Sequence, residues 1–200
     1  MNHLDEALII FIRNPILGQV KTRIGNEVGV KAALDIYLEL LKKTRKITER
    51  LSCKIYLYYS EGIIENDDWN KDQYSKKNQV GDELGIRMKN AFIAEFMHHK
   101  QVIIIGSDCP SITPDLIHRA FTILQHKDLV IGPAIDGGYY LLGMNQPYLS
   151  LFDAIPWSTK DVLRLTLEEI TRIGRSFEIL EELSDIDSQE DWNNYTNSSS

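Results

Sequence analysis

Short apolar runs alternate along the chain with longer segments in which apolar residues recur every three or four positions. A continuous apolar run of about five or six residues is typical of a strand that is buried on both faces of a sheet. The periodic segments are typical of helices that bury one face. We therefore predict strands at Ala7–Ile12, Lys54–Tyr59, Gln101–Ile105, Leu129–Ile131 and Tyr139–Met144.

The periodic segments between these strands predict a series of helices. Thr113 has the character of an N-cap, because Pro114 follows at the first helical position. The predicted helices are Val30–Leu51, Glu83–His98, a helix from Thr113 to about His126, and Asp161–Ile173. Alternating strands and helices favour a doubly wound α/β fold with a mostly parallel, mixed sheet.

Two segments lie outside this alternation. Residues Glu61–Asn78 are polar and predict an irregular surface excursion. No linker or repeat divides the chain, so we expect one domain over residues 1–195 and a disordered tail over residues 196–200.

The charge balance narrows the classes of partner. The 200 residues carry 22 basic and 29 acidic side chains, which gives a net charge of −7. Such a surface repels nucleic acid and anionic membranes, so we expect neither as a partner. The two cysteines are isolated, the start lacks a signal-peptide pattern and no apolar stretch has the length of a bilayer span. We expect a cytoplasmic protein without membrane insertion.

The loop after the first strand concentrates positive charge. It reads R-N-P-I-L-G-Q-V-K-T-R and places Arg13, Lys21 and Arg23 close together without an acidic neighbour, while Gly18 breaks regular structure. Cations at the carboxyl end of a first strand suit a diphosphate. The alternative is a solvated basic turn. The patterns of a P-loop and of a dinucleotide-binding loop are both absent.

A second candidate segment reads Q-V-G-D-E-L-G-I-R-M. Gly81 and Gly85 flank the expected start of a helix, where glycine allows a ligand to approach the backbone. Gln79 has the groups to recognise a base edge, and Arg87 has the charge to hold a phosphate or to pair with a nearby carboxylate. An ordinary turn into a helix explains the pattern equally well.

The segment G-S-D-C-P-S follows the strand that ends at Ile105, which places Asp108 on a rigid element. A carboxylate there suits Mg²⁺ or Mn²⁺, which would bridge to diphosphate oxygens. The alternative is a structural aspartate that accepts backbone N–H bonds. Cys109 beside it is a weak nucleophile candidate, because no histidine stands nearby in the sequence to activate it.

A second carboxylate, Asp136, lies in the turn I-D-G-G-Y-Y between two strands. An Asp-Gly turn is also a plain hairpin signal. The functional interpretation gains from Asp108, because both side chains are expected at strand ends near one another. Asp136 would then share the metal, orient the acceptor or act as its base, and Gly137 and Gly138 would contact substrate.

Three further features carry weaker signals. Trp157 has the ring to stack on a sugar or a base, although a core position is the commoner one, and Ser158 or Thr159 would simply cap the next helix. Asp185 and Asp187, in L-S-D-I-D-S, either cap the short helix expected around Trp192 or contribute to the site.

Taken together, these segments resemble a bacterial family of glycosyltransferase-like proteins within the nucleotide-diphospho-sugar transferase superfamily, some of which are assigned to arsenosugar biosynthesis. The segments that carry the resemblance are F-I-R-N-P-I-L-G-Q-V-K-T-R, G-S-D-C-P-S-I-T-P, G-P-A-I-D-G-G-Y-Y-L-L-G, W-S-T and L-S-D-I-D. The resemblance spans about Ala7 to Trp192 and implies a GT-A-like three-layer sandwich. It also implies a nucleotide pocket formed by the first loop and the Gln79–Arg87 turn, with Asp108 as the metal-binding aspartate.

The resemblance implies a glycosyltransferase that uses a sugar nucleotide, a divalent metal and a small-molecule acceptor. The superfamily also contains guanylyltransferases whose first loop carries an element like Lys21-Thr22-Arg23, so a nucleotidyltransferase that uses a nucleoside triphosphate and releases pyrophosphate is the alternative. The single carboxylate of G-S-D-C-P, in place of the D-x-D of many glycosyltransferases, leaves both open. A third possibility is a catalytically idle nucleotide-binding protein.

Overall fold

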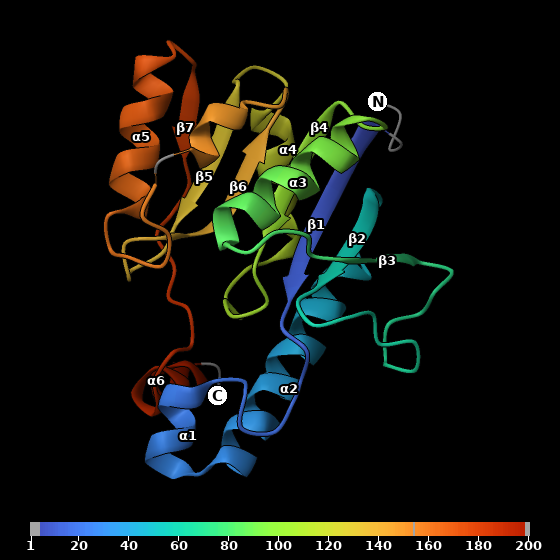
Figure 1. The fold of residues 1–200 in the computed structure, drawn as a ribbon, viewed down its shortest axis with the longest axis vertical. Coiled ribbons are helices and arrows are strands. Elements are labelled where there is room, and N and C mark those ends of the chain that lie inside the picture. Colours follow the sequence, from blue (N-terminus) through green and yellow to red (C-terminus); the bar gives the residue numbers. More distant parts are fainter. Residues whose placement is uncertain (1–4, 154, 199–200) are drawn as a thin grey trace.

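The computed structural model describes residues 5–153 and 155–198, which form a layered α/β fold around one seven-stranded sheet (Figure 1). The strands lie in the order β3-β2-β1-β4-β6-β5-β7. Their bounds are β1 Glu6–Ile12, β2 Lys54–Tyr59, β3 Tyr74–Asn78, β4 Gln101–Ile105, β5 Leu129–Pro133, β6 Tyr139–Met144 and β7 Phe177–Ile179. All neighbouring pairs are parallel except those that β6 makes with β4 and β5.

Helices cover both faces of this sheet. They are α1 Thr22–Val28, α2 Val30–Thr48, α3 Leu84–Phe96, α4 Pro114–Ile123, the short 3₁₀ helix η2 Leu149–Phe152, α5 Val162–Arg172 and α6 Gln189–Ser198. Thr113 caps α4 as its sequence predicts, because its side chain accepts a hydrogen bond from the Leu116 N–H at 3.2 Å.

The alternation of side chains along β1 explains the three layers. Leu8 and Ile10 point into one core with residues of α2 and α4, whereas Ala7 and Ile9 point into a second core with residues of α3, η2 and α5. A strand with both faces buried must be apolar throughout, and Ala7–Ile10 are all fully buried. The predicted fold class, a three-layer sandwich with a mostly parallel mixed sheet, is confirmed.

The prediction of an irregular segment at Glu61–Asn78 is wrong over its last five residues, which form β3 and pair in parallel with β2. Because β3 is an edge strand, only Tyr74 is fully buried and the rest of Y-S-K-K-N stays polar. The apolar pattern used to find the buried strands therefore could not detect it.

Two more short elements also escaped prediction. Strand β7 has only three residues and α1 only seven, so neither is long enough to show a hydrophobic period. Helix α6 continues to Ser198, so residues 196–198 of the expected tail are helical, and residues 199–200 lie outside the described residues. In the described part of the chain, no helix combines the length and apolarity that crossing a bilayer requires.

Candidate functional site

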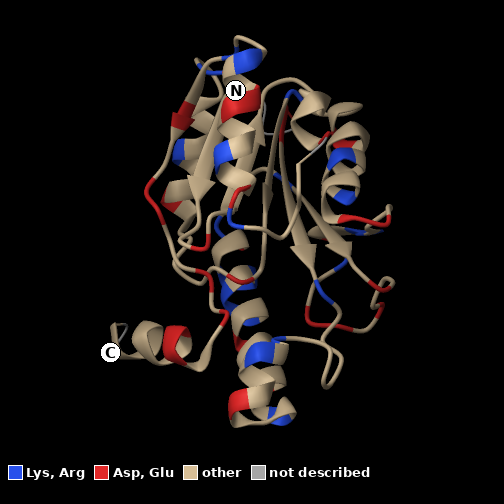
Figure 2. Cartoon of the chain, turned by 60° about the vertical axis from the view of Figure 1, so that its left-hand side comes forward, with Lys and Arg blue, Asp and Glu red and all other residues tan. Residues whose placement is uncertain are grey.

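The topology brings the ends of four segments to one edge of the sheet. Strands β1 and β4 are parallel neighbours, and Ile105 at the end of β4 pairs with Ile10, two residues before the end of β1. Strand β6 runs the opposite way, with Leu141 opposite Ile105, so the turn before it starts at the same edge. A bridge between Ala134 and Leu183 adds the segment that follows β7. Figure 2, which colours the backbone by residue type, shows charged residues on the loops at this edge, whereas the strands are largely uncharged.

These segments surround a cleft of about 640 Å³. Its charged lining consists of four cations and four carboxylates: Arg13, Lys21, Arg23, Lys160, Asp108, Asp136, Asp185 and Asp187. Its apolar lining includes Phe11, Leu84, Met88, Tyr139, Trp157 and Val162. The cleft is therefore balanced in charge within a protein whose net charge is −7.

Lys21 is the central cation of this cleft. Its Nζ lies 3.1 Å from Asp108 Oδ2 and 3.4 Å from Asp187 Oδ1, and only 5% of its side chain is exposed. It immediately precedes α1 and adopts a left-handed backbone with φ 46°, which is uncommon for a residue with a side chain. Asp187 also pairs with Arg23, at 3.5 Å, in the first turn of α1. The predicted basic loop is thus paired with Asp108, which follows β4, and with Asp187, which follows β7.

Asp108 has one oxygen engaged and one without a partner. Its Oδ2 pairs with Lys21, whereas its Oδ1 is buried and finds no hydrogen-bond partner among the described residues. The Asp108 carbonyl accepts a hydrogen bond from the Ile186 N–H at 3.0 Å, which fixes the segment of Asp185 and Asp187 against β4. A buried acceptor without a donor is costly, so the orientation of Oδ1 favours a ligand there.

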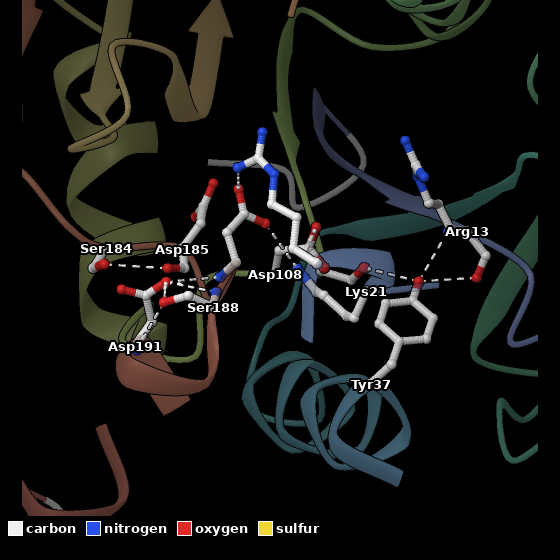
Figure 3. A network of polar contacts seen from close by, with 11 residues as sticks. Arg13, Lys21, Tyr37, Asp108, Ser184, Asp185, Ser188 and Asp191 are labelled. Atoms are coloured by element: carbon white, nitrogen blue, oxygen red, sulfur yellow. Dashed lines mark hydrogen bonds and ion pairs between the residues drawn. The ribbon is translucent and has the colours of Figure 1, made fainter. Parts of the chain in front are cut away.

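Asp185 retains its proton at a higher pH than an ordinary aspartate. Burial raises the pKa of Asp185 to about 7, and the nearby charges of Asp108 and Asp136 act in the same direction while Lys21 opposes them. Asp185 and Asp187 were expected from the sequence either to cap the short helix around Trp192 or to contribute to the site. Ser188 and Asp191 make the capping bonds of α6 instead, which leaves Asp185 and Asp187 facing the cleft (Figure 3).

Cys109 does not serve as an activated thiol. It is buried and packs beside Asp185, and burial together with the Asp185 charge raises the pKa of its thiol well above the usual range. A thiol that holds its proton is a poor nucleophile.

The carboxylates fit a magnesium or manganese ion that also contacts a ligand. No group of three or more His, Cys, Asp or Glu side chains within the described ranges converges closely enough to hold a metal alone. Mg²⁺ in substrate sites commonly takes one or two carboxylates and completes its shell with phosphate oxygens and water. The unpartnered Oδ1 of Asp108, with Asp185 nearby, supplies hard oxygen donors of that kind.

Tyr37 on α2 is a residue that sequence reasoning missed. Its hydroxyl accepts from the Arg13 N–H and donates to the Arg13 carbonyl, both at 2.9 Å, and lies 3.2 Å from Ser107 Oγ (Figure 3). It thereby joins the end of β1 to the end of β4. Its only sequence signal is a phenol on the apolar face of a helix, and that is common in ordinary cores.

The turn before β6 forms the wall of the cleft opposite the first loop, because β4 lies between β1 and β6 in the sheet. Asp136 Oδ1 accepts the Gly138 N–H at 2.9 Å, and Gly137 has φ 91°. A Cβ on Gly137 would come within 2.2 Å of the Lys160 carbonyl oxygen, so the turn packs directly on the segment before α5. Gly138 lines the cleft, whereas Gly137 fixes the position of Lys160.

Trp157 lines the cleft and rests on Gly85. A Cβ on Gly85 would lie 1.9 Å from Trp157 Nε1, which only glycine tolerates. Trp157 also stacks on Phe152 with ring centroids 6.1 Å apart. Trp157 therefore packs against the core as a structural residue does and also lines the cleft, so its stacking on a sugar or a base stays a prediction.

Six sequence candidates lie outside the lining of the cleft: Gly18, Gln79, Gly81, Gly85, Arg87 and Gly137. The Gln79 amide donates to the carbonyls of Ile12 and Tyr58, and Arg87 Nε donates to the Gly81 carbonyl at 2.8 Å. These contacts shape the turn that leads into α3. Gly18 has φ 78° and lies in the exposed part of the first loop.

The sequence matches the family described as "Uncharacterized protein conserved in bacteria (DUF2064)" over residues 43–159. The chain belongs to this family. Among curated protein sequences, none matches this family member significantly.

Solved structures extend the comparison. A proposed nucleotide-diphospho-sugar transferase from Desulfovibrio desulfuricans is 31% identical, with a TM-score of 0.84, and the match covers 92% of this chain and 83% of that one. The resemblance to the nucleotide-diphospho-sugar transferases is therefore confirmed.

More distant structures share the fold of this DUF2064 member. The inositol-1-phosphate CTP transferase from T. maritima is 12% identical, with a TM-score of 0.59, over 98% of this chain and 94% of that one. A Mycobacterium tuberculosis protein in complex with manganese is 11% identical, with a TM-score of 0.57, over 95% and 96%.

The raised pKa of Asp185 predicts how stability varies with pH in this family member. Between about pH 4 and pH 7 the folded protein keeps a proton that the unfolded chain has released, so the free energy of unfolding falls across that range. Asp185→Asn removes this cost. In metal-free buffer its melting temperature should exceed the wild-type value by at least about 2 °C at pH 7.5, and the excess should shrink at pH 4.5.

Thermal melts at the two pH values test this, with Asp35→Asn as the control because Asp35 is exposed on α2 and does not line the cleft. An equal difference between Asp185→Asn and wild type at both pH values would contradict the assignment.

Proposed function

We propose that this chain is a transferase that binds a nucleotide-activated sugar at its diphosphate and transfers the glycosyl group to a small-molecule acceptor, with Mg²⁺ or Mn²⁺ bound. The observation that carries the proposal is the shared cleft, in which Lys21 pairs with Asp108 and Asp187 at one edge of the sheet. The Desulfovibrio neighbour, described as a proposed nucleotide-diphospho-sugar transferase, supports this class of substrate.

The diphosphate would lie against Arg13, Lys21 and Arg23. Arg13 makes no ion pair among the described residues, so its guanidinium is available, while its backbone is held by Tyr37. Lys21 already lies within salt-bridge distance of two carboxylates, so it sits where an anion and a metal would meet. Positive charge fixed in advance stabilises a leaving nucleoside diphosphate without reorganisation.

Asp108 and Asp185 are the residues that would hold the metal, whose charge would neutralise the diphosphate as it leaves. The manganese complex of the Mycobacterium tuberculosis protein supports the choice of metal. Asp187 would keep Lys21 and Arg23 in place.

Asp136 would orient the acceptor or take its proton. It is exposed at the cleft and only its Oδ1 is engaged, by the Gly138 N–H. Gly138 and Trp157 line the same part of the cleft and would contact substrate. Gln79, Gly81, Gly85 and Arg87 would act by shaping the α3 turn and seating Trp157, and Gly18 by shaping the first loop.

Nucleotidyl transfer is the second candidate. It is favoured by the single carboxylate of G-S-D-C-P, where many glycosyltransferases carry D-x-D. The CTP transferase that shares the fold supports it as well. The same cations and the same aspartates would then act on the α-phosphate of a nucleoside triphosphate.

The reaction product separates the two candidates. Glycosyl transfer releases a nucleoside diphosphate and nucleotidyl transfer releases pyrophosphate. We expect nucleoside diphosphate when the protein is incubated with sugar nucleotides, Mn²⁺ and a panel of acceptors. Pyrophosphate release from nucleoside triphosphates in its place would overturn the glycosyl assignment.

Asp108→Asn should reduce Mn²⁺ affinity at least about tenfold, because it removes the charge of the proposed metal ligand while keeping its shape. Isothermal titration calorimetry measures the affinity, and the melting temperature in metal-free buffer shows that the fold is intact. Asp35→Asn, a neutralised exposed carboxylate, should bind Mn²⁺ like wild type. Unchanged Mn²⁺ affinity in Asp108→Asn would remove Asp108 from the proposal.

Lys21→Met should weaken nucleoside diphosphate binding about tenfold while leaving Mn²⁺ affinity equal or higher, because it removes an ammonium that repels the metal and attracts the phosphate. Lys31→Met, which neutralises an exposed lysine of α2, is the matched control. A parallel loss of both affinities would instead indicate local unfolding, and no loss of nucleotide affinity would exclude Lys21 from the phosphate site.

A further inference from the structure

The cleft contains a fourth cation, Lys160, that the proposed nucleotide site does not use. Lys160 lines the wall opposite the first loop, and its ammonium makes no ion pair or hydrogen bond among the described residues. The carboxylate that follows it, Asp161, is already paired with Arg164 at 3.2 Å. Lys160 therefore contributes positive charge to the cleft without a fixed partner.

The position of Lys160 is built into the fold. Gly137 allows the Lys160 backbone to pack directly on the D-G-G turn, and the Leu163 N–H donates to the Gly137 carbonyl at 2.9 Å. Any side chain at position 137 would displace the Lys160 carbonyl. The ammonium thus extends from a segment whose course is fixed by the turn that carries Asp136.

Ser158 lies beside it in a strained conformation. Its φ is 64°, and the only other residue with a side chain and a positive φ in the described ranges is Lys21. Both line the cleft, from opposite walls. Ser158 is exposed, and its hydroxyl makes no hydrogen bond with the residues that the structure describes, whereas Thr159 donates to the Pro156 carbonyl at 2.8 Å. Ser158 therefore does not cap α5, although the sequence allowed that interpretation. Its hydroxyl is available to a ligand.

We propose that Lys160 and Ser158 form a second anion subsite, which binds a phosphate or carboxylate group of the acceptor. The inference rests on the proposed function, because it assigns the diphosphate to Arg13, Lys21 and Arg23 and leaves the opposite wall for the other substrate. An acceptor anchored there presents its reacting group to Asp136, which lies on the same wall as Lys160. The acceptor is thereby defined as an anionic small molecule.

The test uses inorganic pyrophosphate with Mg²⁺ as the probe for the diphosphate wall, and inorganic phosphate or acetate as the probe for the second subsite. Calorimetry is carried out on the full chain, first with pyrophosphate alone and then with phosphate or acetate added to protein saturated with pyrophosphate. We expect phosphate or acetate to bind the protein that is saturated with pyrophosphate. Lys160→Met should weaken that binding at least about fivefold and leave pyrophosphate affinity unchanged. Lys31→Met should change neither.

Ser158→Gly gives a readout that a structural role would not. Glycine accepts a positive φ without strain, so the variant should melt at the same or a higher temperature while binding phosphate or acetate more weakly. The proposed subsite would be overturned if neither phosphate nor acetate bound, or if Lys160→Met weakened pyrophosphate binding by the same factor. If Lys21→Met left the affinity for pyrophosphate unchanged, the proposed function would be contradicted instead, so the two failures are distinguishable.

Discussion

The ion pairs of Lys21 with Asp108 and Asp187 hold the candidate site together. Four aspartates line one cleft, and carboxylates confined in this way repel one another unless a cation lies between them. Lys21 fills that place, nearly out of contact with water. It joins the first loop to the end of β4 and to the segment after β7, which are far apart in the sequence. Burial raises the pKa of Asp185, and the charges of Asp108 and Asp136 act in the same direction.

The sheet topology makes this arrangement possible. In a purely parallel sheet the turn before β6 would lie at the opposite edge, and Asp136 would be remote from Asp108. Because β6 alone runs antiparallel among the described strands, the turn and the carboxyl ends of β1 and β4 meet. Ligands in open α/β sheets bind beyond the carboxyl ends of the strands, and the reversal of β6 adds an acidic turn to that edge.

The sequence predicted the buried strands and the fold class because continuous apolar runs report burial on both faces. It did not detect β3, whose edge position keeps it polar, or the short β7 and α1. At the site, Arg13, Lys21, Asp108 and Asp136 were found because unusual residues follow strand ends. Tyr37 and Lys160 were missed because their positions depend on tertiary packing: Tyr37 through a helix on one face of the sheet, and Lys160 through Gly137. Only the structure shows that Asp185 and Asp187 do not cap α6, because Ser188 and Asp191 make the capping hydrogen bonds.

The most direct measurement of the central claim is a crystal structure of the protein grown with Mn²⁺ and a nucleoside diphosphate, with the metal located by its anomalous scattering. The account predicts a single strong anomalous peak within coordinating distance of Asp108 Oδ1, and a diphosphate in contact with both Arg13 and Lys21. A metal bound away from Asp108, or a diphosphate that avoids Lys21, would contradict it.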